Sequence, residues 1–383
     1  MIHVLHLADL HLGWRPQALA GREAERQRER DSLLRRAVDW ALRPSSEVAL
    51  VVIAGDLFDH HRPPEELVRA VLDDLGRLTR AGIELVTVPG NHDELTYHDS
   101  VYRMHAAEWP GILIDGAQPA RVATREIQGF ACHLYGSAYV GGLTRTDSPL
   151  ERFPRTSDPG LHLAVFHGSL DPDAAHRSLP LRPEALSAAG YDYVALGHVH
   201  RHRQHPLGRT VAVYPGAVEG RGFDDPGVGH LTVVRLGDGP PRLEAVPIDA
   251  RPIRSTAVDV THLDGAGDPT NFIEAVSAAA LEVANQAAIQ RIRLTGVPAV
   301  RLSAELLDRL WERLQPHFYY LELEDATRAV PEEAAARWAG EPTVRGLFIQ
   351  RMQRAIAAAT DPSMRARLER ALWRGLDALE GVR

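Results

Sequence analysis

Short apolar runs alternate with longer amphipathic stretches over the first half of the chain. The runs that predict buried strands are Val4–Ala8, Val48–Ala54, Ile83–Pro89, Leu161–Phe166 and Tyr193–Leu196. Between them, apolar positions recur at helical spacing over Arg22–Leu42 and Pro64–Ala81. This alternation of strand and helix patterns predicts an α/β layered domain.

Further strands are expected between Gly208 and Pro247, where Gly and Pro separate short β-branched runs. Thr210–Tyr214 and His230–Val234 are the clearest of these runs, and we expect them in a second sheet. The predicted fold class is therefore α/β, a two-sheet sandwich flanked by helices that occupies residues 1–250.

The rest of the chain predicts two further regions. Residues 251–330 repeat the α/β pattern as a small capping domain, with elements at Ser255–Val260, Pro269–Ala287, Ala288–Leu294, Ser303–Gln315 and Phe318–Glu324. Residues 331–383 lack strand patterning and predict two helices. Asp361 is the expected N-cap of the second helix, with Pro362 in its first position.

Bulk composition indicates an ordinary water-soluble chain. Hydrophobic residues make up 44% and charged residues 25% of the sequence. No run approaches the ~20 apolar residues of a membrane span, and the first residues carry no targeting pattern. The formal net charge of -8 argues mildly against a protein that coats nucleic acid non-specifically. We expect a cytoplasmic protein without a membrane partner.

The single cysteine limits the metal chemistry of the chain. Cys132 lies in an apolar run and is expected to be a buried strand residue. One cysteine excludes an internal disulfide and a Cys-ligated zinc site, and it fits a reducing compartment. Any metal must therefore be held by His, Asp and Asn.

Each of the first five apolar runs leads into residues that can bind metals. The segments are Asp9-Leu10-His11, Gly55-Asp56, Gly90-Asn91-His92-Asp93, His167-Gly168 and Gly197-His198-Val199-His200. Carboxyl ends of strands meet in one crevice of an open α/β sheet, so these side chains can converge. The i, i+2 spacing within the first and last segments places two ligands on one face of an extended chain.

This donor set suits two divalent cations that share a carboxylate better than one four-coordinate zinc. Asp56 is the expected bridge. A mixed nitrogen and oxygen shell without thiolate favours Mn²⁺, with Fe²⁺, Zn²⁺ and Mg²⁺ as alternatives. Each motif alone could be a satisfied polar residue at a strand end, but the complete ordered set favours a metal site.

The ordered set resembles the calcineurin-like metallophosphoesterases, whose motif order is Asp-x-His, Gly-Asp, Gly-Asn-His-Asp/Glu, His and Gly-His-x-His. Its finer detail is similar to the SbcD-like DNA repair exonucleases over Ala8–Gly13, Gly55–Asp59, Pro89–Asp93 and Tyr214–Gly216. Val218–Phe223 resembles the YhaO-type branch. The resemblance covers about residues 1–230 and is looser beyond them.

The resemblance implies a role for each site residue. One metal would be held by Asp9, His11, Asp56 and His200, and the other by Asp56, Asn91, His167 and His198. Water activated by the two ions would attack phosphorus in line. His92 would contact the phosphate and could protonate the leaving group, with Asp93 either orienting it or serving as an ordinary turn carboxylate.

One position differs among the relatives. Archaeal and eukaryotic relatives carry a catalytic histidine three residues after the bridging aspartate, whereas this chain has Asp59 there, as the bacterial branch commonly does. His60 and His61 follow directly. They are expected to be exposed turn residues outside the site.

The resemblance also implies partners beyond DNA. SbcD-like nucleases grip the coiled-coil base of an SbcC-like, SMC-type ATPase with C-terminal helices. The apolar anchors would be Trp338, Leu347, Phe348, Trp373 and Leu376, and packing of these helices within the chain is an equal alternative. A homodimer through the segments near 64–81 and 97–109 would use Tyr97, Tyr102, Met104 and Trp109, unless these residues pack internally.

The leading hypothesis is a dinuclear-metal-dependent DNA exo- and endonuclease that processes ends or double-strand breaks with an SbcC-like ATPase. A phosphodiesterase acting on cyclic nucleotides or other small phosphodiesters is one alternative, and residues 254–383 disfavour it. A regulatory scaffold for an ATPase, with little nuclease activity, is another, and the intact ligand set argues against it. A protein phosphatase is disfavoured because Asp59-His60-His61 replaces the expected Asp-Arg-Gly.

Overall fold

The structure is a computed structural model that describes residues 1–141, 152–171, 178–237, 239–261, 263, 268–298, 300, 302–328 and 332–380. The chain forms two compact units, Met1–Arg251 and Pro252–Arg383. The predicted boundary at residues 330 and 331 lies outside the described residues, so the division of the chain into three regions stays a prediction.

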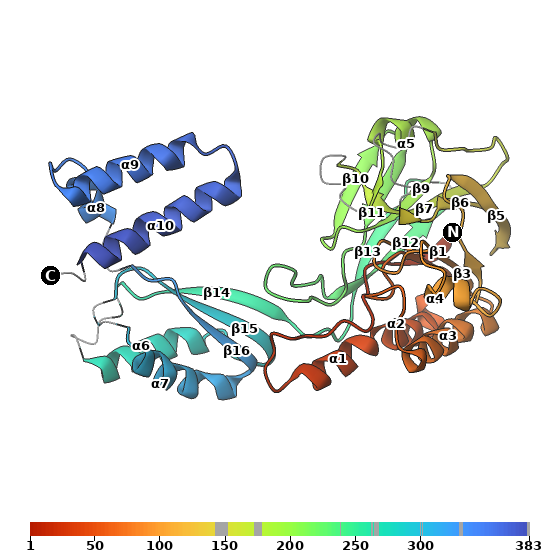
Figure 1. Ribbon diagram of the computed structural model, residues 1–383. Helices are drawn as coiled ribbons and strands as arrows, with labels where there is room; N and C mark the ends of the chain where they lie inside the picture. The colour runs from red at the N-terminus through yellow and green to blue at the C-terminus, as the bar shows by residue number, and fades with distance from the viewer. Residues whose placement is uncertain are drawn as a thin grey trace. The chain divides into compact units, whose positions relative to one another are not determined.

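Two sheets form the centre of the first unit (Figure 1). The first has the order β13-β12-β1-β2-β3-β4, formed by Arg242–Pro247, His230–Leu236, Ile2–Leu7, Val48–Ala54, Glu84–Val88 and Ile112–Leu113. The second has the order β10-β11-β9-β7-β6-β5, formed by Arg203–Leu207, Thr210–Tyr214, Tyr193–Gly197, Leu161–Ser169, Phe130–Ser137 and Ala120–Ile127. A short strand, β8 (Leu179–Pro180), pairs with β7.

Helices cover the outer faces of both sheets. The helical elements of this unit are α1 (Glu23–Asp31), α2 (Leu33–Ala41), α3 (Glu65–Arg80), α4 (Val101–Met104), α5 (Pro183–Ala189) and the 3-10 turn η1 (Pro44–Ser46). Apolar residues of α2 and α3 pack against the first sheet, and Leu186 of α5 packs against the second. The predicted sandwich flanked by helices is confirmed.

The parallel strands are continuously apolar because both of their faces are buried. In β7, Leu163 and Val165 join the core shared with the first sheet, whereas Ala164 and Phe166 face the cluster that contains α5. Cys132 on β6 is fully buried, as expected for a strand residue.

The prediction for the strands after Gly208 was partly wrong. β11 lies in the second sheet, but β12 and β13 belong to the first, where β12 pairs antiparallel with β1 from Ile2↔Leu236 to His6↔Thr232. A β-branched run indicates a strand without specifying its partner. Pairing with β1 is decided by long-range closure of the sandwich.

The second unit contains a parallel sheet of β14 (Ile253–Asp259), β15 (Asn285–Thr295) and β16 (Phe318–Asp325). Two helices, α6 (Pro269–Leu281) and α7 (Ala304–Leu314), pack against this sheet, and Phe272 of α6, Ile292 of β15 and Leu310 of α7 lie in their common core. The 3-10 turn η4 (Gln315–His317) leads into β16. The helix predicted over Pro269–Ala287 ends earlier. The Ala-rich segment after Leu281 favours helix locally, but pairing of β15 with both neighbours outweighs that propensity.

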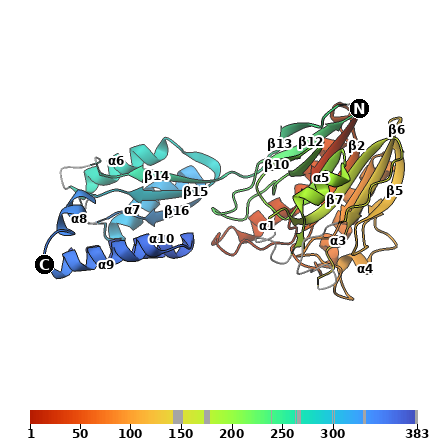
Figure 2. The ribbon, with the colours of Figure 1, turned by 90° about the horizontal axis from the view of Figure 1, so that it is seen from above.

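Within residues 332–380, the described stretch of the C-terminal part, there are three helices where two were predicted, α8 (Glu332–Trp338), α9 (Val344–Ala358) and α10 (Pro362–Glu380). α9 and α10 lie side by side in Figure 1, and they overlap in the view from above in Figure 2. Thr343 caps α9 by accepting a hydrogen bond from the Gly346 N–H, which separates α9 from α8. Asp361 accepts hydrogen bonds from Ser363 N and Met364 N, so the predicted cap is confirmed.

Side-chain burial separates the predicted contact residues into two classes. Leu376 is fully buried, while Trp338, Phe348 and Trp373 pack against the same cluster, so internal packing uses these anchors. Leu347 remains 51% exposed. In the first unit Tyr102 and Trp109 are buried, whereas Tyr97 and Met104 are exposed. None of the described helices has the length and apolar character needed to cross a membrane.

His6 on β1 makes stability depend on pH. Its ring is fully buried, and Nδ1 lies 2.8 Å from the hydroxyl of Tyr193 on β9. Burial is the main cause that lowers the pKa of His6 to about 3, from an ordinary value of 6.5. Between these values the unfolded chain holds a proton on His6 that the folded chain does not hold.

We therefore expect the free energy of unfolding contributed by His6 to be fully present above pH 6.5 and to fall toward pH 3. The loss should be about 1.4 kcal/mol per pH unit. Urea unfolding of the metal-free protein and of His6→Asn, at several pH values, would measure it. Asn can still bond the Tyr193 hydroxyl but does not titrate, so equal pH slopes would contradict the assignment.

Candidate metal centre

The predicted ligands lie at the carboxyl ends of strands from both sheets. Asp9 and His11 follow β1, Asp56 follows β2, Asn91 and His92 follow β3, His167 lies near the end of β7, and His198 and His200 follow β9. The strands β1, β2 and β3 belong to one sheet of the sandwich, and β7 and β9 belong to the other. The two sheets direct their carboxyl ends toward a common point, so the side chains still converge.

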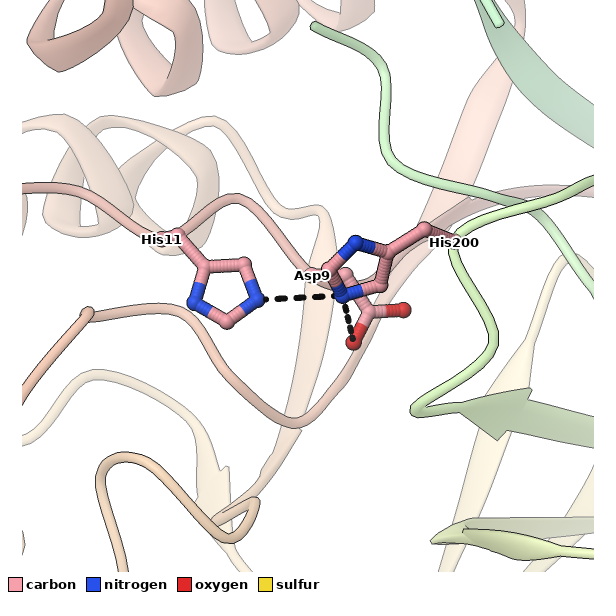
Figure 3. Close-up of side chains that lie close together, drawn as sticks. All are labelled: Asp9, His11 and His200. Carbon is pink, nitrogen blue, oxygen red and sulfur yellow. Dashed lines mark hydrogen bonds and ion pairs between the residues drawn. The ribbon is translucent and has the colours of Figure 1, made fainter. Parts of the chain in front are cut away.

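One group of side chains contains Asp9, His11 and His200 (Figure 3). His11 Nε2 lies 3.2 Å from His200 Nε2, which lies 3.9 Å from Asp9 Oδ1. Asp56 Oδ2 is 3.7 Å from the same His11 nitrogen. Two imidazole nitrogens that face each other beside carboxylates require a proton or a cation between them. The donor chemistry therefore fits a divalent metal.

A second group surrounds His167 on the other side of Asp56. His167 Nε2 lies 3.3 Å from Asp56 Oδ2 and 3.1 Å from Asn91 Oδ1, which is 3.0 Å from His198 Nδ1. His167 Nδ1 lies 2.9 Å from the Ala54 carbonyl oxygen and donates to it, leaving Nε2 to face these oxygens. Asp56 thus contacts both groups, the position that a bridging ligand requires.

Two further clusters of ligand atoms combine residues of both groups or add His92 to them. His11, Asp56 and His92 form one, and Asp9, Asp56 and His167 form the other, each with its ligand atoms within 4.8 Å of one another. His92 is thereby close enough to be a ligand as well as a phosphate-contacting residue.

The backbone at the centre adopts a conformation that side chains rarely occupy. Positive φ angles occur at Asp9 (56°), His11 (47°), Asp56 (50°) and His198 (98°). Hydrogen bonds hold these turns together, from Asp9 N to Gly55 O at 3.1 Å and from His198 N to the Asp9 carboxylate at 3.0 Å. Each such residue costs on the order of 1–3 kcal/mol, and backbone strain of this kind clusters at functional sites.

The ionisable side chains at the centre shift one another's pKa values, so the binding of a cation is coupled to the loss of a proton. Burial alone would raise the pKa of Asp56, but His167 and His11 outweigh it and hold that pKa far below its usual range. Burial likewise opposes protonation of His167, yet Asp56 and Asp9 raise its pKa to about 9. Burial and His167 lower the pKa of His198 to about 4. A cation that binds here would therefore displace a proton from His167.

His92 and Asp93 have separate surroundings. His92 Nδ1 lies 3.1 Å from the Asp59 carbonyl oxygen, and its backbone N–H donates to Asp56 Oδ1 at 2.8 Å. Asp93 is fully buried and accepts hydrogen bonds from Phe58 N, Gly90 N and the Tyr102 hydroxyl. Of the two roles expected for Asp93, the structure therefore supports the turn carboxylate.

The neighbours of Asp59 confirm part of the expectation for this turn. Asp59 Oδ1 lies 3.2 Å from His11 Nδ1, so this carboxylate borders the centre. The His60 side chain is 75% exposed, and the His61 ring stacks on Tyr97 with 4.0 Å between centroids. Neither histidine belongs to the metal-ligand groups found among the described residues.

Gly90 leaves no room for a side chain beside Asp56. A Cβ atom at this position would lie 2.2 Å from Asp56 Oδ1. We expect Gly90→Ala to weaken Mn²⁺ binding by about 10-fold or more, because it displaces the carboxylate between the two ligand groups. Titration of the metal-free protein would measure this. Gly239→Ala is the matched control, since its Cβ would meet nothing within 4 Å, and an equal effect of both variants would contradict the prediction.

The sequence-based prediction missed the residues behind His200. The Asp225 carboxylate lies 2.8 Å from His200 Nδ1, and Arg221 donates to Asp225 at 3.0 Å. The available signal was the pair Asp224-Asp225 directly after the Val218–Phe223 segment. Spacing alone does not indicate which of two adjacent carboxylates faces a ligand.

A groove of about 1340 Å³ borders the centre at Asp59. Segments 12–18, 59–65 and 98–105 contribute to its walls. Trp14, Arg15, Arg62 and His98 supply aromatic and basic groups, while Glu65 and Asp99 add acidic ones. The groove thus offers a mixed polar surface directly beside the candidate metal ligands.

Residues 2–202, just over half of the chain, match the calcineurin-like phosphoesterase family. The chain belongs to this family, which confirms the resemblance drawn from its motifs. This family uses a dinuclear metal centre, and groups of side chains that could hold metal ions are present among the described residues.

Curated relatives lie within one part of the family. A DNA double-strand break repair protein Mre11 of Methanopyrus kandleri is 27% identical over 57% of this chain and 49% of its own. Mre11 of Aeropyrum pernix is 29% identical over 68% and 64%. The uncharacterized metallophosphoesterase YhaO of Bacillus subtilis is 25% identical over 61% and 57%. The matching region spans about half to two thirds of these relatives' lengths.

Proposed function

We propose that this protein is a dinuclear-metal-dependent DNA phosphodiesterase of the SbcD-like type, with exo- and endonuclease activity on DNA ends or double-strand breaks. The observation that carries the proposal is the position of Asp56 between two groups of ligands beside an open groove. The names of the Mre11 relatives support DNA break repair as the setting.

The proposed ligands divide at Asp56. Asp9, His11 and His200 would hold one ion and Asn91, His167 and His198 the other, with Asp56 shared. Two bound divalent ions, most suitably Mn²⁺, would activate water and stabilise negative charge on the phosphate. The Asp59 carbonyl oxygen, which faces His92 Nδ1, and the Asp56 carboxylate, which accepts from the His92 backbone N–H, orient His92, whose Nε2 can then approach the leaving oxygen of the substrate.

The groove supports a substrate larger than a small phosphodiester. Small-molecule pockets typically enclose about 300–1,000 Å³, and this groove measures about 1340 Å³. Trp14 can stack on a base, and Arg15 and Arg62 can contact phosphates, which is the combination that single-stranded nucleic acid requires. These features favour DNA over a cyclic nucleotide.

The exposed apolar residues of α9 and α10 suggest a partner of the SbcC-like ATPase class. Val344, Leu347 and Met364 are 78%, 51% and 45% exposed, so they can bind another chain after the internal anchors are used. Exposed Tyr97 and Met104 leave a homodimer contact available in the first unit. A cytoplasmic location would fit both partners.

The proposal is tested with end-labelled duplex, hairpin and single-stranded DNA, in Mn²⁺ and in EDTA, with and without the ATPase from a neighbouring gene. Metal-dependent cleavage is expected, and EDTA should remove it. Hydrolysis of cyclic nucleotides without DNA cleavage would instead support the small-substrate phosphodiesterase. Failure to hydrolyse either substrate, together with stable ATPase binding, would support the regulatory scaffold.

A further inference from the structure

The ring of His200 is held from two sides. Nε2 faces His11 Nε2 at 3.2 Å and Asp9 Oδ1 at 3.9 Å, while Nδ1 lies 2.8 Å from Asp225 Oδ2. Nδ1 also lies 3.3 Å from Arg221 Nη2, but the Asp225 carboxylate is nearer and favours the tautomer in which Nδ1–H donates and Nε2 keeps its lone pair. That lone pair then points into the ligand group with Asp9 and His11.

Asp225 is itself fixed by a compact turn. Arg221 Nε donates to Asp225 Oδ2 at 3.0 Å, and the Arg221 backbone N–H donates to the Asp225 carbonyl at 2.8 Å. The Asp225 N–H returns a hydrogen bond to Gly222 O at 3.1 Å. The carboxylate therefore has little freedom to turn away from His200.

Buried charges anchor this turn to the loop after β1. Arg26 and Arg36 each lie 2.5 Å from the Glu219 carboxylate. Arg30 donates to the carbonyl oxygens of Gly220 at 2.7 Å and Leu10 at 3.2 Å. One guanidinium thus connects the segment before Asp225 to the segment between Asp9 and His11.

Buried charges of this kind contribute little net free energy to folding, because removing them from water is unfavourable. Arg26, Arg30 and Glu219 are 1%, 1% and 2% exposed, and desolvation of buried charges often cancels their mutual attraction. The network instead fixes the spacing between two segments, because Arg30 connects the loop that carries Asp9 and His11 to the turn that carries Asp225.

We propose that Asp225 is a positioning residue that orients His200 and selects its metal-binding tautomer, and that the Arg221 turn holds Asp225 in place. Carboxylates behind a histidine ligand typically raise metal affinity in this way. The inference rests on the proposed metal ligands and not on the proposed DNA substrate.

The experiment is titration of the metal-free 383-residue chain with Mn²⁺, monitored by calorimetry and by electron paramagnetic resonance of the unbound ion. Asp225→Ala is expected to weaken one of two binding events by about 10- to 100-fold and to leave the other unchanged. Asp225→Asn should recover part of the affinity, because its amide oxygen still accepts from Nδ1–H. Asp224→Ala removes an exposed neighbouring carboxylate and should match wild type.

Thermal unfolding of the metal-free variants separates positioning from folding. Equal unfolding temperatures with selective loss of one Mn²⁺ would support the proposal. Wild-type affinity in Asp225→Ala would overturn it, as would equal loss of both ions accompanied by a destabilised metal-free protein. If wild type bound no Mn²⁺, both this proposal and the metal assignment would fail, whereas absence of DNA cleavage would affect the nuclease proposal alone.

Discussion

Replacement of Asp56 by Asn is expected to abolish the binding of both divalent cations and to slow phosphodiester hydrolysis by about 10³-fold or more. The carboxylate faces both ligand groups, with Oδ2 3.3 Å from His167 Nε2 and 3.7 Å from His11 Nε2. Asn keeps the size of the side chain and its acceptor for the His92 N–H. It removes the negative charge that two adjacent cations require.

Two measurements check this result. Wild type should unfold at a higher temperature when Mn²⁺ is added, since a ligand that binds the folded state stabilises it, and Asp56→Asn should show no such increase. Hydrolysis of a chromogenic phosphodiester reports the rate. Asp39→Asn on α2 changes an exposed carboxylate and serves as the control. Retention of one Mn²⁺ by Asp56→Asn would show that this residue belongs to a single ion and is not a bridge.

Substitution of His92 by Gln is expected to lower kcat by about 10²- to 10⁴-fold while both Mn²⁺ ions still bind. His92 Nδ1 lies 3.1 Å from the Asp59 carbonyl oxygen, so the other ring nitrogen is available for the phosphate or the leaving group. Gln can donate a hydrogen bond to phosphate but cannot transfer a proton at neutral pH. The largest change should therefore appear in kcat and not in metal affinity.

The proximity of His92 to His11 and Asp56 makes metal stoichiometry the decisive control. If His92→Gln lost one Mn²⁺, the residue would be a ligand and its assigned role in proton transfer would be wrong. His317→Gln changes an exposed histidine that belongs neither to the candidate ligands nor to the groove, and it should leave both kcat and metal binding unchanged. The same titration applies to both variants, so the comparison shows whether the effect depends on the loss of a histidine at position 92.

Several elements were predictable because their signals are local. β2 matches the predicted Val48–Ala54 run, since a strand buried on both faces must be apolar at every position. The Asp361 cap was predictable because its hydrogen bonds reach only the next three residues. Ligand types directly after buried strands were visible for the same reason.

Other features depend on partners that are distant in sequence. Nothing within His230–Leu236 indicates that it pairs with β1, and nothing near Leu376 distinguishes a partner-binding side chain from one that packs against Ile349. The contact between Asp225 and His200 joins residues 25 positions apart. These contacts depend on how strands and helices close on each other, and local propensity carries no information about that closure.

The sequence by itself determined the residue types of the candidate metal ligands, their order, and the strands that present them, because buried strands and ligand motifs are short-range patterns. The tertiary structure decided which sheet each strand joins, how Asp56 comes to face both ligand groups, and which carboxylate supports His200. Those outcomes follow from packing two sheets so that their carboxyl ends meet, which is a property of the whole first unit and of no single segment.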